Sequence, residues 1–379
     1  AALLAEWPKE QPRACIAILA FPLGCPEGCH HNATRGGGGG NNNHQHRVCN
    51  ASVPLRRTLK DLNRLLYNRA RAGVLPKGWV PYPIVVFHTD WPKEVRDWVG
   101  SFTRATVLWQ QVAFDEQTLP FADGQYGGTR EGREAVLQFL RPYHPHGLHF
   151  TSPGYHGYGY RLMCRFFAGL VMHAPPLSLF DYYWRLDNGD SQVGRIREDP
   201  FRALAAARGS LGVHRLPGAG GSQFRSERSW HGATRGLVRD FGAAEGRPLS
   251  KLFHESHVKS FLGRPDPLLY YNNFEILDMR RFRGPTHWRL FLAAERKQMF
   301  LCPPDGGAGG AAATCDAAST RRKCRPREGK GWSGKCHGWG DADFRTLAAT
   351  LKEVTPRGLR VDVVPLQYAV SYNHPVPWC

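Results

Sequence analysis

The run Cys15-Ile16-Ala17-Ile18-Leu19-Ala20-Phe21 is continuously apolar, as a strand buried on both faces requires. Ile84 to Asp90 reads as a second buried strand, and a third strand pattern spans Thr106 to Phe114. Helical patterns separate the three, one from Leu55 to Leu66 and one from Glu94 to Phe102. This β-α-β-α-β order predicts a parallel sheet, which commonly binds a nucleotide at the carboxyl ends of its strands.

The same reasoning extends to the rest of the chain. Gly157 to His173 has helical spacing, and Asp181 to Asp187 reads as a strand. Further on, Phe344 to Val354 forms a helical face and Leu359 to Val364 reads as a strand. The sequence therefore predicts an α/β fold with one mostly parallel, Rossmann-like sheet flanked by helices. Strand alternation would put one set of side chains on one face, Tyr182, Trp184 and Leu186, and the next set on the other, Tyr183, Arg185 and Asp187.

Domain organisation is simple. Residues 1–12 are expected to be the tail of a truncated stem, and residues 13–379 a single domain with long loop insertions. Low-complexity loops are predicted at about residues 30–47 and 303–335. The first residues, Ala1 to Ala5, could be the end of a hydrophobic segment.

The composition fits a folded, basic chain. Hydrophobic residues make up 42% of the sequence and aromatic residues 12%, which excludes global disorder. The formal charge of +18 is compatible with nucleic-acid binding or with a basic surface that attracts any anion. No nucleic-acid-binding motif organises the basic residues, so we expect no nucleic-acid partner.

Cysteines and sequons favour the secretory pathway. Ten cysteines, an even number, lie mostly in loop sequence and suit disulfide bonds. The stretch from Cys25 to Cys49 could instead bind zinc, but its spacing matches no standard finger. Asn32-Ala33-Thr34 and Asn50-Ala51-Ser52 are glycosylation sequons in the same early loop.

Two acidic residues stand out. Asp187 ends a strand and could hold Mn²⁺ or Mg²⁺ against a nucleotide diphosphate, because both cations prefer oxygen ligands. The alternative is an ordinary turn, Asp187-Asn188-Gly189-Asp190, that only ends the strand. Glu275 lies inside an apolar stretch, so it is either functional or paired with an arginine such as Arg280 or Arg281.

Two later residues have similar alternatives. Asp341, in Trp339-Gly340-Asp341, could act in the site or cap a helix that begins near Ala342. His374, in Tyr372-Asn373-His374-Pro375, could be a metal ligand or a surface residue.

Taken together, four segments resemble glycosyltransferase family 15, the fungal-type α-1,2-mannosyltransferases of the Golgi. Tyr160-Arg161-Leu162-Met163-Cys164-Arg165, followed by Tyr183-Trp184-Arg185-Leu186-Asp187, resembles the family's Tyr-x-x-Met-Cys-Arg and Tyr-Trp-Arg-Val-Glu. Asn273-Phe274-Glu275-Ile276 and Trp339-Gly340-Asp341-Ala342 match two further family motifs, and Tyr372-Asn373-His374-Pro375 resembles a third.

The resemblance implies a GT-A-like fold, GDP-mannose as donor, Mn²⁺ as cofactor, and transfer with retention to a mannose 2-hydroxyl. It implies a Golgi enzyme of type II membrane topology that acts on glycoprotein or glycolipid glycans. His374 and Asp187 would bind the metal, and Asp187, Arg185 and Tyr160 the donor. Glu275 would be the nucleophile or the group that stabilises positive charge on the sugar. Asp341 and Tyr160 would complete the catalytic set by contacting the donor or the acceptor.

The chain also departs from the family pattern. Asp187 stands where the family has Glu, Arg345 where it has His, and Asn373 at the first position of its His pair. A non-catalytic relative that kept the fold and binds carbohydrate or nucleotide is therefore the alternative.

Overall fold

The computed structural model describes residue 5 and residues 7–20, 52–67, 78–88, 91–112, 158–187, 191–196, 198–213, 230–263, 270, 274–297, 299–300, 341–366 and 368–372. The sequons, the low-complexity loops and every cysteine except Cys15 and Cys164 lie outside these residues. Cys15 is a buried free thiol, so the expectation of disulfides does not hold for this residue.

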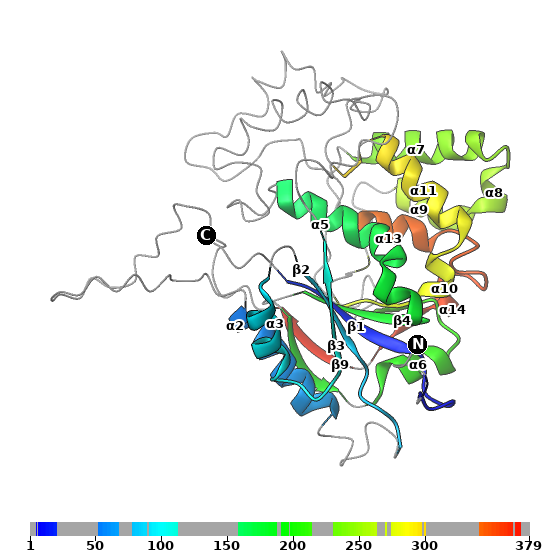
Figure 1. Ribbon diagram of the computed structural model, residues 1–379. Coiled ribbons are helices and arrows are strands. Elements are labelled where there is room, and N and C mark those ends of the chain that lie inside the picture. Colours follow the sequence, from blue (N-terminus) through cyan, green and yellow to red (C-terminus); the bar gives the residue numbers. More distant parts are fainter. Residues whose placement is uncertain are drawn as a thin grey trace, which may run out of the picture.

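A seven-stranded sheet in the order β3-β2-β1-β4-β7-β6-β8 forms the centre of the molecule (Figure 1). Its strands are β1 (Ala14–Leu19), β2 (Ile84–His88), β3 (Val107–Gln111), β4 (Tyr182–Asp187), β6 (Leu211–Val213), β7 (Ile276–Asp278) and β8 (Val363–Pro365). The first four strands are mutually parallel. β7 runs antiparallel to both β4 and β6, whereas β6 and β8 are parallel. A separate antiparallel pair joins β5 (Ser191–Ile196) to β9 (Tyr368–Tyr372).

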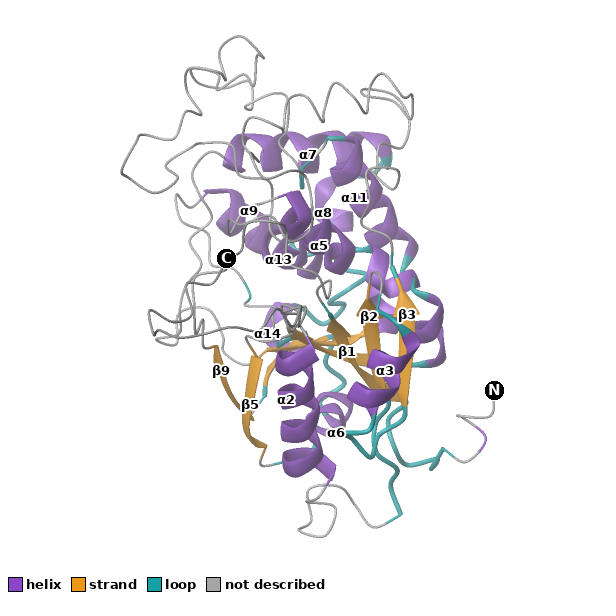
Figure 2. Cartoon of the chain, turned by 60° about the vertical axis from the view of Figure 1, so that its left-hand side comes forward, coloured by secondary structure: helices purple, strands orange, loops and turns teal. Residues whose placement is uncertain are grey.

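Helices cover both faces of the sheet, as Figure 2 shows. One face packs against α2 (Ser52–Leu62), α3 (Lys93–Gly100) and α6 (Pro200–Ala206). The other packs against α5 (Tyr158–Ala168), α7 (Trp230–Ala244), α11 (Pro285–Arg296) and α13 (Asp341–Ala349). The remaining short helices are η1 (Asn63–Tyr67), η5 (Leu170–His173), η6 (Pro175–Leu179), α8 (Leu249–Leu252), α9 (Glu255–Gly263), α10 (Met279–Phe282) and α14 (Leu359–Asp362).

The apolar run of β1 explains this three-layer arrangement. Ile16 and Ile18 enter the core on the α2 side, whereas Ala17 and Leu19 enter the core on the α5 side. Each buried isoleucine or leucine side chain contributes roughly 1.5–3 kcal/mol from leaving water. A strand that is apolar at every position is therefore stable only between two layers of helices, as the sequence predicted.

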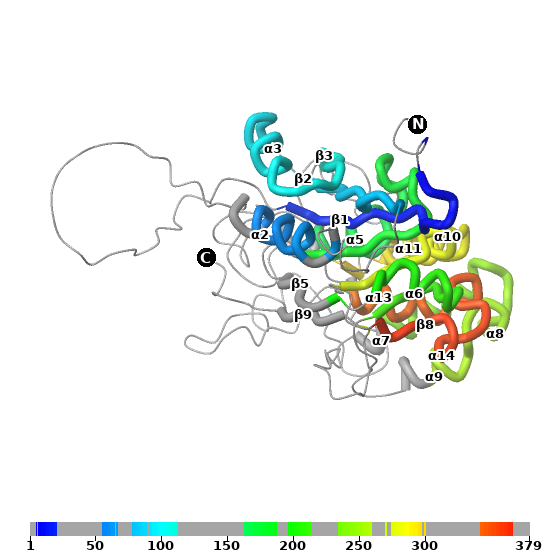
Figure 3. Tube along the Cα trace, turned by 90° about the horizontal axis from the view of Figure 1, so that it is seen from below, coloured from blue at the N-terminus to red at the C-terminus, as the bar shows by residue number. Residues whose placement is uncertain are grey.

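The strand predicted at Leu359 to Val364 was wrong in its first half. Residues 359–362 form the short helix α14, and only Val363–Pro365 pair in the sheet. Gly358 reverses the chain with φ +93°, and the Asp362 carboxylate accepts hydrogen bonds of 2.7 Å from both the backbone N and Nε of Arg357. These contacts keep the segment in a turn before it reaches β6. Figure 3 shows the resulting proximity of α14 and β8 to α6.

Candidate active site

The candidate site lies where β4 ends and β7 begins. β7 runs antiparallel to β4, with Ile276 opposite Trp184. The backbone N of Arg185 donates a 2.9 Å hydrogen bond to the carbonyl of Glu275. Asp187 is the last residue of β4 and pairs in register with Leu19 of β1. The topology therefore brings Arg185, Asp187 and Glu275 to one edge of the sheet, although Glu275 is far away in sequence.

Strand alternation in β4 is as predicted. Tyr182, Trp184 and Leu186 belong to the core on the α2 side, and Tyr183 to the core on the α5 side. Arg185 shares that second face, because its guanidinium lies 3.9 Å from the ring centre of Phe167 on α5.

Glu275 is completely buried, and its carboxylate accepts hydrogen bonds from Tyr183 and Arg345. The Tyr183 hydroxyl donates to Oε1 at 2.8 Å, and Arg345 Nε donates to Oε2 at 2.9 Å. An arginine does pair with this acid, but it is Arg345 of α13 and neither Arg280 nor Arg281. Arg280 pairs with Asp278 at the other end of β7. A buried carboxylate is costly unless its charge is paired and its oxygens are hydrogen-bonded, and this arrangement meets both conditions.

Arg345 is itself fully buried. It donates through one terminal nitrogen to the carbonyl of Phe167 at 2.7 Å, and its guanidinium lies 4.8 Å from the ring centre of Phe282. Burial and the charge on Arg345 hold the pKa of His287 well below its usual range, so His287 stays neutral. Burial, followed by the charge on Glu275, raises the pKa of Tyr183 well above its usual value. Tyr183 therefore remains a hydrogen-bond donor at physiological pH.

Arg185 and Asp187 form a second ion pair at the rim of the site. Arg185 Nε donates to Asp187 Oδ1 at 3.0 Å, and another of its nitrogens lies 3.5 Å from the Met163 sulfur. The Arg185 side chain is 1% exposed and that of Asp187 is 16% exposed. Among Arg185, Asp187, Glu275 and Arg345, Asp187 is thus the most accessible to a ligand in solvent.

For the other predicted residues, the structure gives at most the position in a helix. Tyr160 lies in the first turn of α5, seven residues before Phe167, and Asp341 is the first residue of α13, four residues before Arg345. α5 and α13 pack against each other, so these two positions belong to neighbouring helices on the same side of the sheet (Figure 2). The side chains of Tyr160 and Asp341, and the whole of His374, lie outside the described residues.

Asp187 fits part of a site for a divalent cation. Its carboxylate offers the oxygen donors that Mn²⁺ prefers, and it is partly exposed at the carboxyl end of a parallel strand. Within the described residues, no group of three or more His, Cys, Asp and Glu side chains could hold a metal ion. Further ligands would have to come from the remainder of the chain, where His374 lies.

Sequence reasoning alone gave no role to Tyr183, Phe167 or Met163, and it noted Arg345 only as a departure from the family pattern. Alternation in β4 was a usable signal for Tyr183, because it put this residue on the face of Arg185. Arg345 is the sequence neighbour of Phe344, which belongs to the apolar face of α13. A charged residue so close to the apolar face of a helix indicates that it has a buried partner.

Comparison with known proteins finds a family that resembles part of the chain. Residues 154–212, which include α5 and β4, match the family model described as Glycolipid 2-alpha-mannosyltransferase. The O-glycoside alpha-1,2-mannosyltransferase homolog 3 of Schizosaccharomyces pombe is 27% identical over 38% of this chain and 37% of its own length. Mannosyltransferase KTR6 of Saccharomyces cerevisiae is 28% identical over 35% of this chain and 28% of its own length. The matches thus span roughly a third of these curated relatives.

Solved structures resemble the chain over more of its length. Core-mannan synthase A (CmsA/Ktr4) of Aspergillus fumigatus, solved in an Mn/GDP form, aligns over 90% of this chain and 70% of its own with a TM-score of 0.54 and 16% identity. Mannosyltransferase Ktr4p of S. cerevisiae, in complex with GDP, aligns over 90% of this chain and 67% of its own with a TM-score of 0.52 and 15% identity.

At such low sequence identity, these structural alignments show the fold alone. It is the GT-A-like fold expected from the sequence. None of the helices in the described residues has both the length and the apolar composition needed to cross a lipid bilayer. The match over residues 154–212 and the two curated relatives make this part of the chain similar to glycosyltransferase family 15, and they support a distant relationship to that family.

Proposed function

We propose that the chain is a retaining α-mannosyltransferase that moves mannose from GDP-mannose to a hydroxyl of a mannose-containing glycan, with an α-1,2 linkage. One observation carries the proposal: Asp187, Arg185 and Glu275 meet at the carboxyl edge of the parallel strands. In open α/β sheets this edge is where ligands bind. The two similar structures, one in an Mn/GDP form and one in complex with GDP, support the same donor chemistry for this chain.

In this proposal Asp187 and His374 would hold Mn²⁺, which when bound would offset negative charge on the departing GDP. Arg185 and Tyr160 would contact the donor. Arg185 is well suited to anchor the site, because the Phe167 ring and the Asp187 carboxylate hold its guanidinium in place. A preorganised cation at the edge of a nucleotide site stabilises charge without having to reorganise during the reaction.

Glu275 has two chemical options. As a nucleophile, one carboxylate oxygen would bond to the anomeric carbon while the bond to GDP breaks; the acceptor hydroxyl would then displace Glu275 and lose its proton. As an electrostatic group, Glu275 would stabilise positive charge on the sugar without forming a bond. We favour the electrostatic option, because the Glu275 side chain is 0% exposed and a bond to the anomeric carbon needs an accessible carboxylate oxygen. Asp341 and Tyr160 are the proposed contacts to the acceptor or donor in either case.

The test is transfer of mannose by purified protein supplied with GDP-mannose, Mn²⁺ and an α-mannoside acceptor. We expect a product whose new linkage is α by NMR. Glu275→Gln should reduce transfer at least ~100-fold while GDP binding remains, as with loss of other preorganised charged groups. Asp362→Asn is the matched control, because Asp362 is also a buried acid paired with an arginine but lies at the end of α14, away from the site. If the wild type yields neither product nor released GDP, the proposed mannosyl transfer is contradicted. If Glu275→Gln keeps full activity, the role proposed for Glu275 is contradicted.

A second candidate is a non-catalytic relative that binds carbohydrate or nucleotide. The complete burial of Glu275, with both oxygens engaged, favours it. Calorimetry separates the two candidates: glycan binding without Mn²⁺-dependent GDP binding would support the non-catalytic one.

We also propose that the chain works in the Golgi lumen as part of a type II membrane protein. The sequons at Asn32 and Asn50 support a secretory route. In secreting cells, an endoglycosidase should increase the gel mobility of the wild-type chain and leave Asn32→Gln/Asn50→Gln unchanged. A wild-type chain that shows no shift would remove this support.

A further inference from the structure

A cavity lies at the opposite edge of the sheet from Asp187. It has a volume of about 470 Å³, and its lining includes Trp7, Gln11, Arg13, Asp181, Tyr182 and Arg280. Arg13 directly precedes β1 and Asp181 directly precedes β4, so the cavity lies at the amino ends of these parallel strands. The six residues of β4 separate it from Asp187 by roughly 20 Å, at about 3.3 Å per residue.

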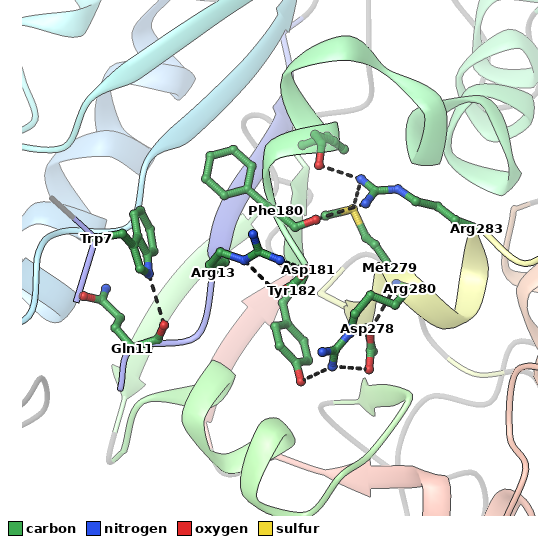
Figure 4. A network of polar contacts seen from close by, with 11 residues as sticks. Trp7, Gln11, Arg13, Phe180, Asp181, Tyr182, Asp278, Met279, Arg280 and Arg283 are labelled. Atoms are coloured by element: carbon green, nitrogen blue, oxygen red, sulfur yellow. Dashed lines mark hydrogen bonds and ion pairs between the residues drawn. The ribbon is translucent and has the colours of Figure 1, made fainter. Parts of the chain in front are cut away.

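The polar groups of the cavity are already fixed in place. Arg13 donates to the two oxygens of Asp181 at 3.0 and 2.9 Å. Arg280 donates to the two oxygens of Asp278 at 2.8 Å each, and to the Tyr182 hydroxyl at 2.7 Å. Figure 4 shows Trp7 and Gln11 on one side of the Arg13–Asp181 pair, and Tyr182 with Arg280 and Asp278 on the other. The Arg13 and Arg280 side chains are each 54% exposed, so each keeps surface for a ligand.

The charges of the cavity balance, although the chain as a whole carries +18. Lys9, Arg13 and Arg280 are its cations. Glu10 and Asp181 also line it, and Asp278 neutralises Arg280 from behind. A site with no net charge gives little attraction to a phosphate or a nucleotide. Paired carboxylate and guanidinium groups can still exchange hydrogen bonds with neutral hydroxyl groups.

Trp7 adds an aromatic surface. Its ring is partly exposed and packs 6.3 Å from the ring of Tyr82 and 6.2 Å from that of Phe180, which hold it against the core. A fixed aromatic face beside planar hydrogen-bonding pairs suits a ligand that has both C–H faces and hydroxyl groups. The volume also falls within the range of roughly 300–1,000 Å³ that is typical of small-molecule sites.

We propose that this cavity is a second glycan-binding site, which takes one or a few neutral hexose units. It is separate from the donor site on the other edge. If the proposed mannosyl transfer is correct, the cavity binds a part of the glycan remote from the reacting hydroxyl.

The test uses two neighbouring alanines of α6. Ala205 lines the cavity, whereas Ala206 does not line it and is exposed. Ala205→Trp should fill the cavity, and Ala206→Trp adds the same side chain outside it. Isothermal titration with α-mannotriose and with maltotriose, in the presence of saturating GDP and Mn²⁺, should show binding to the wild type and to Ala206→Trp. We expect affinity at least tenfold weaker in Ala205→Trp.

Three results would overturn the proposal. These are no binding of either trisaccharide at millimolar concentration, equal binding to both tryptophan variants, and binding of inorganic phosphate instead of the trisaccharides.

Trp7→Leu provides a second check, because it removes the aromatic face without filling the cavity and should also weaken binding. Transfer to methyl α-mannoside, too small to reach both edges, should be unchanged in Ala205→Trp. If the wild type shows no mannosyl transfer, the proposed function is contradicted but the second glycan-binding site is not, because trisaccharide binding is measured separately.

Discussion

Arg345 carries a positive charge into the most deeply buried part of the candidate site. Its removal would leave the Glu275 carboxylate buried without its ion-pair partner, while the Tyr183 hydroxyl still donates to Oε1. Breaking a buried ion pair from one side costs roughly 3–5 kcal/mol. We therefore expect Arg345→Met to lower the free energy of unfolding by about this amount in urea titrations.

The double variant Glu275→Gln/Arg345→Met should recover part of that loss, because neither charge is then left unpaired. Arg280→Met is the matched control: its pair with Asp278 is half exposed and should contribute at most about 1 kcal/mol. Additive effects of the two single changes at Glu275 and Arg345 would show that the pair does not act as a unit.

At the residue scale, the sequence identified the acid but not its partner. Glu275 was noticeable because it interrupts an apolar run, and a charge there needs compensation. Glu275 directly precedes β7, whereas its partner Arg345 lies 70 residues away on α13, and no local pattern connects the two. Which arginine pairs with Glu275 depends on how α13 packs against α5, which is a tertiary property.

At the scale of elements, the close approach of η5 to α11 depends on Gly169. A Cβ atom at this position would overlap the ring of Phe291. We expect Gly169→Ala to destabilise the protein by about 1–3 kcal/mol, as overpacking does. Gly236, inside α7, has open space at the same position, so Gly236→Ala should stabilise by about 0.5–1 kcal/mol. Thermal unfolding of both variants measures the contrast, and equal shifts would contradict it.

A second contact joins α5 to α11 through Arg165 and Glu295, 2.5 Å apart. Burial raises the pKa of Glu295 to about 7, although Arg165 lowers it. The native state therefore holds this proton more tightly than the unfolded chain, whose carboxyl titrates near 4.5. The resulting stabilisation is complete below about pH 4.5 and is lost as the pH rises through about 7.

We expect the free energy of unfolding of Glu295→Gln to vary less with pH between 5 and 8 than that of the wild type. Each pH unit between the pKa of Glu295 in the native state and that in the unfolded chain corresponds to about 1.4 kcal/mol of stability. Glu245→Gln is the control, because Arg289 of α11 lowers the pKa of Glu245 and its titration falls below this window. Urea titrations at several pH values measure both, and parallel curves for Glu295→Gln and the wild type would exclude the assignment.

Local sequence patterns predicted the longer elements well. The runs that became β1, β2 and β4 are apolar throughout or alternate clearly, and the periodic segment that became α5 was equally clear. Leu359 to Val364 misled because four of its six residues are apolar or β-branched, while the turn depends on Gly358 and on the Asp362 carboxylate. β7 has only three residues, which is too short for a periodicity to show. Its insertion between β4 and β6 brings Glu275 to the site, and that is a property of the topology.

At the scale of the whole molecule, the charge of +18 has to be reconciled with the proposed sugar-nucleotide substrate. In the described residues several cations are already paired on the surface, including Arg13 with Asp181, Arg289 with Glu245 and Lys259 with Glu255. These pairs lie on different elements and form no continuous stripe along one helix or groove. A basic surface of this kind attracts polyanions through diffuse electrostatics, which salt screens over about 10 Å at 0.1 M.

We therefore expect weak, non-selective polyanion binding. Single-stranded RNA, duplex DNA and heparin of equal charge should bind alike at 20 mM NaCl, and the binding should be largely lost by 200 mM, as measured by fluorescence anisotropy. GDP in the presence of Mn²⁺ should be retained at the higher salt, because a preorganised site with a metal and with Arg185 is screened less than exposed charges. RNA or DNA binding that survives 200 mM NaCl and discriminates between sequences would require a groove that orients bases. The basic residues would then have to form a nucleic-acid interface, because the donor site could not account for such binding.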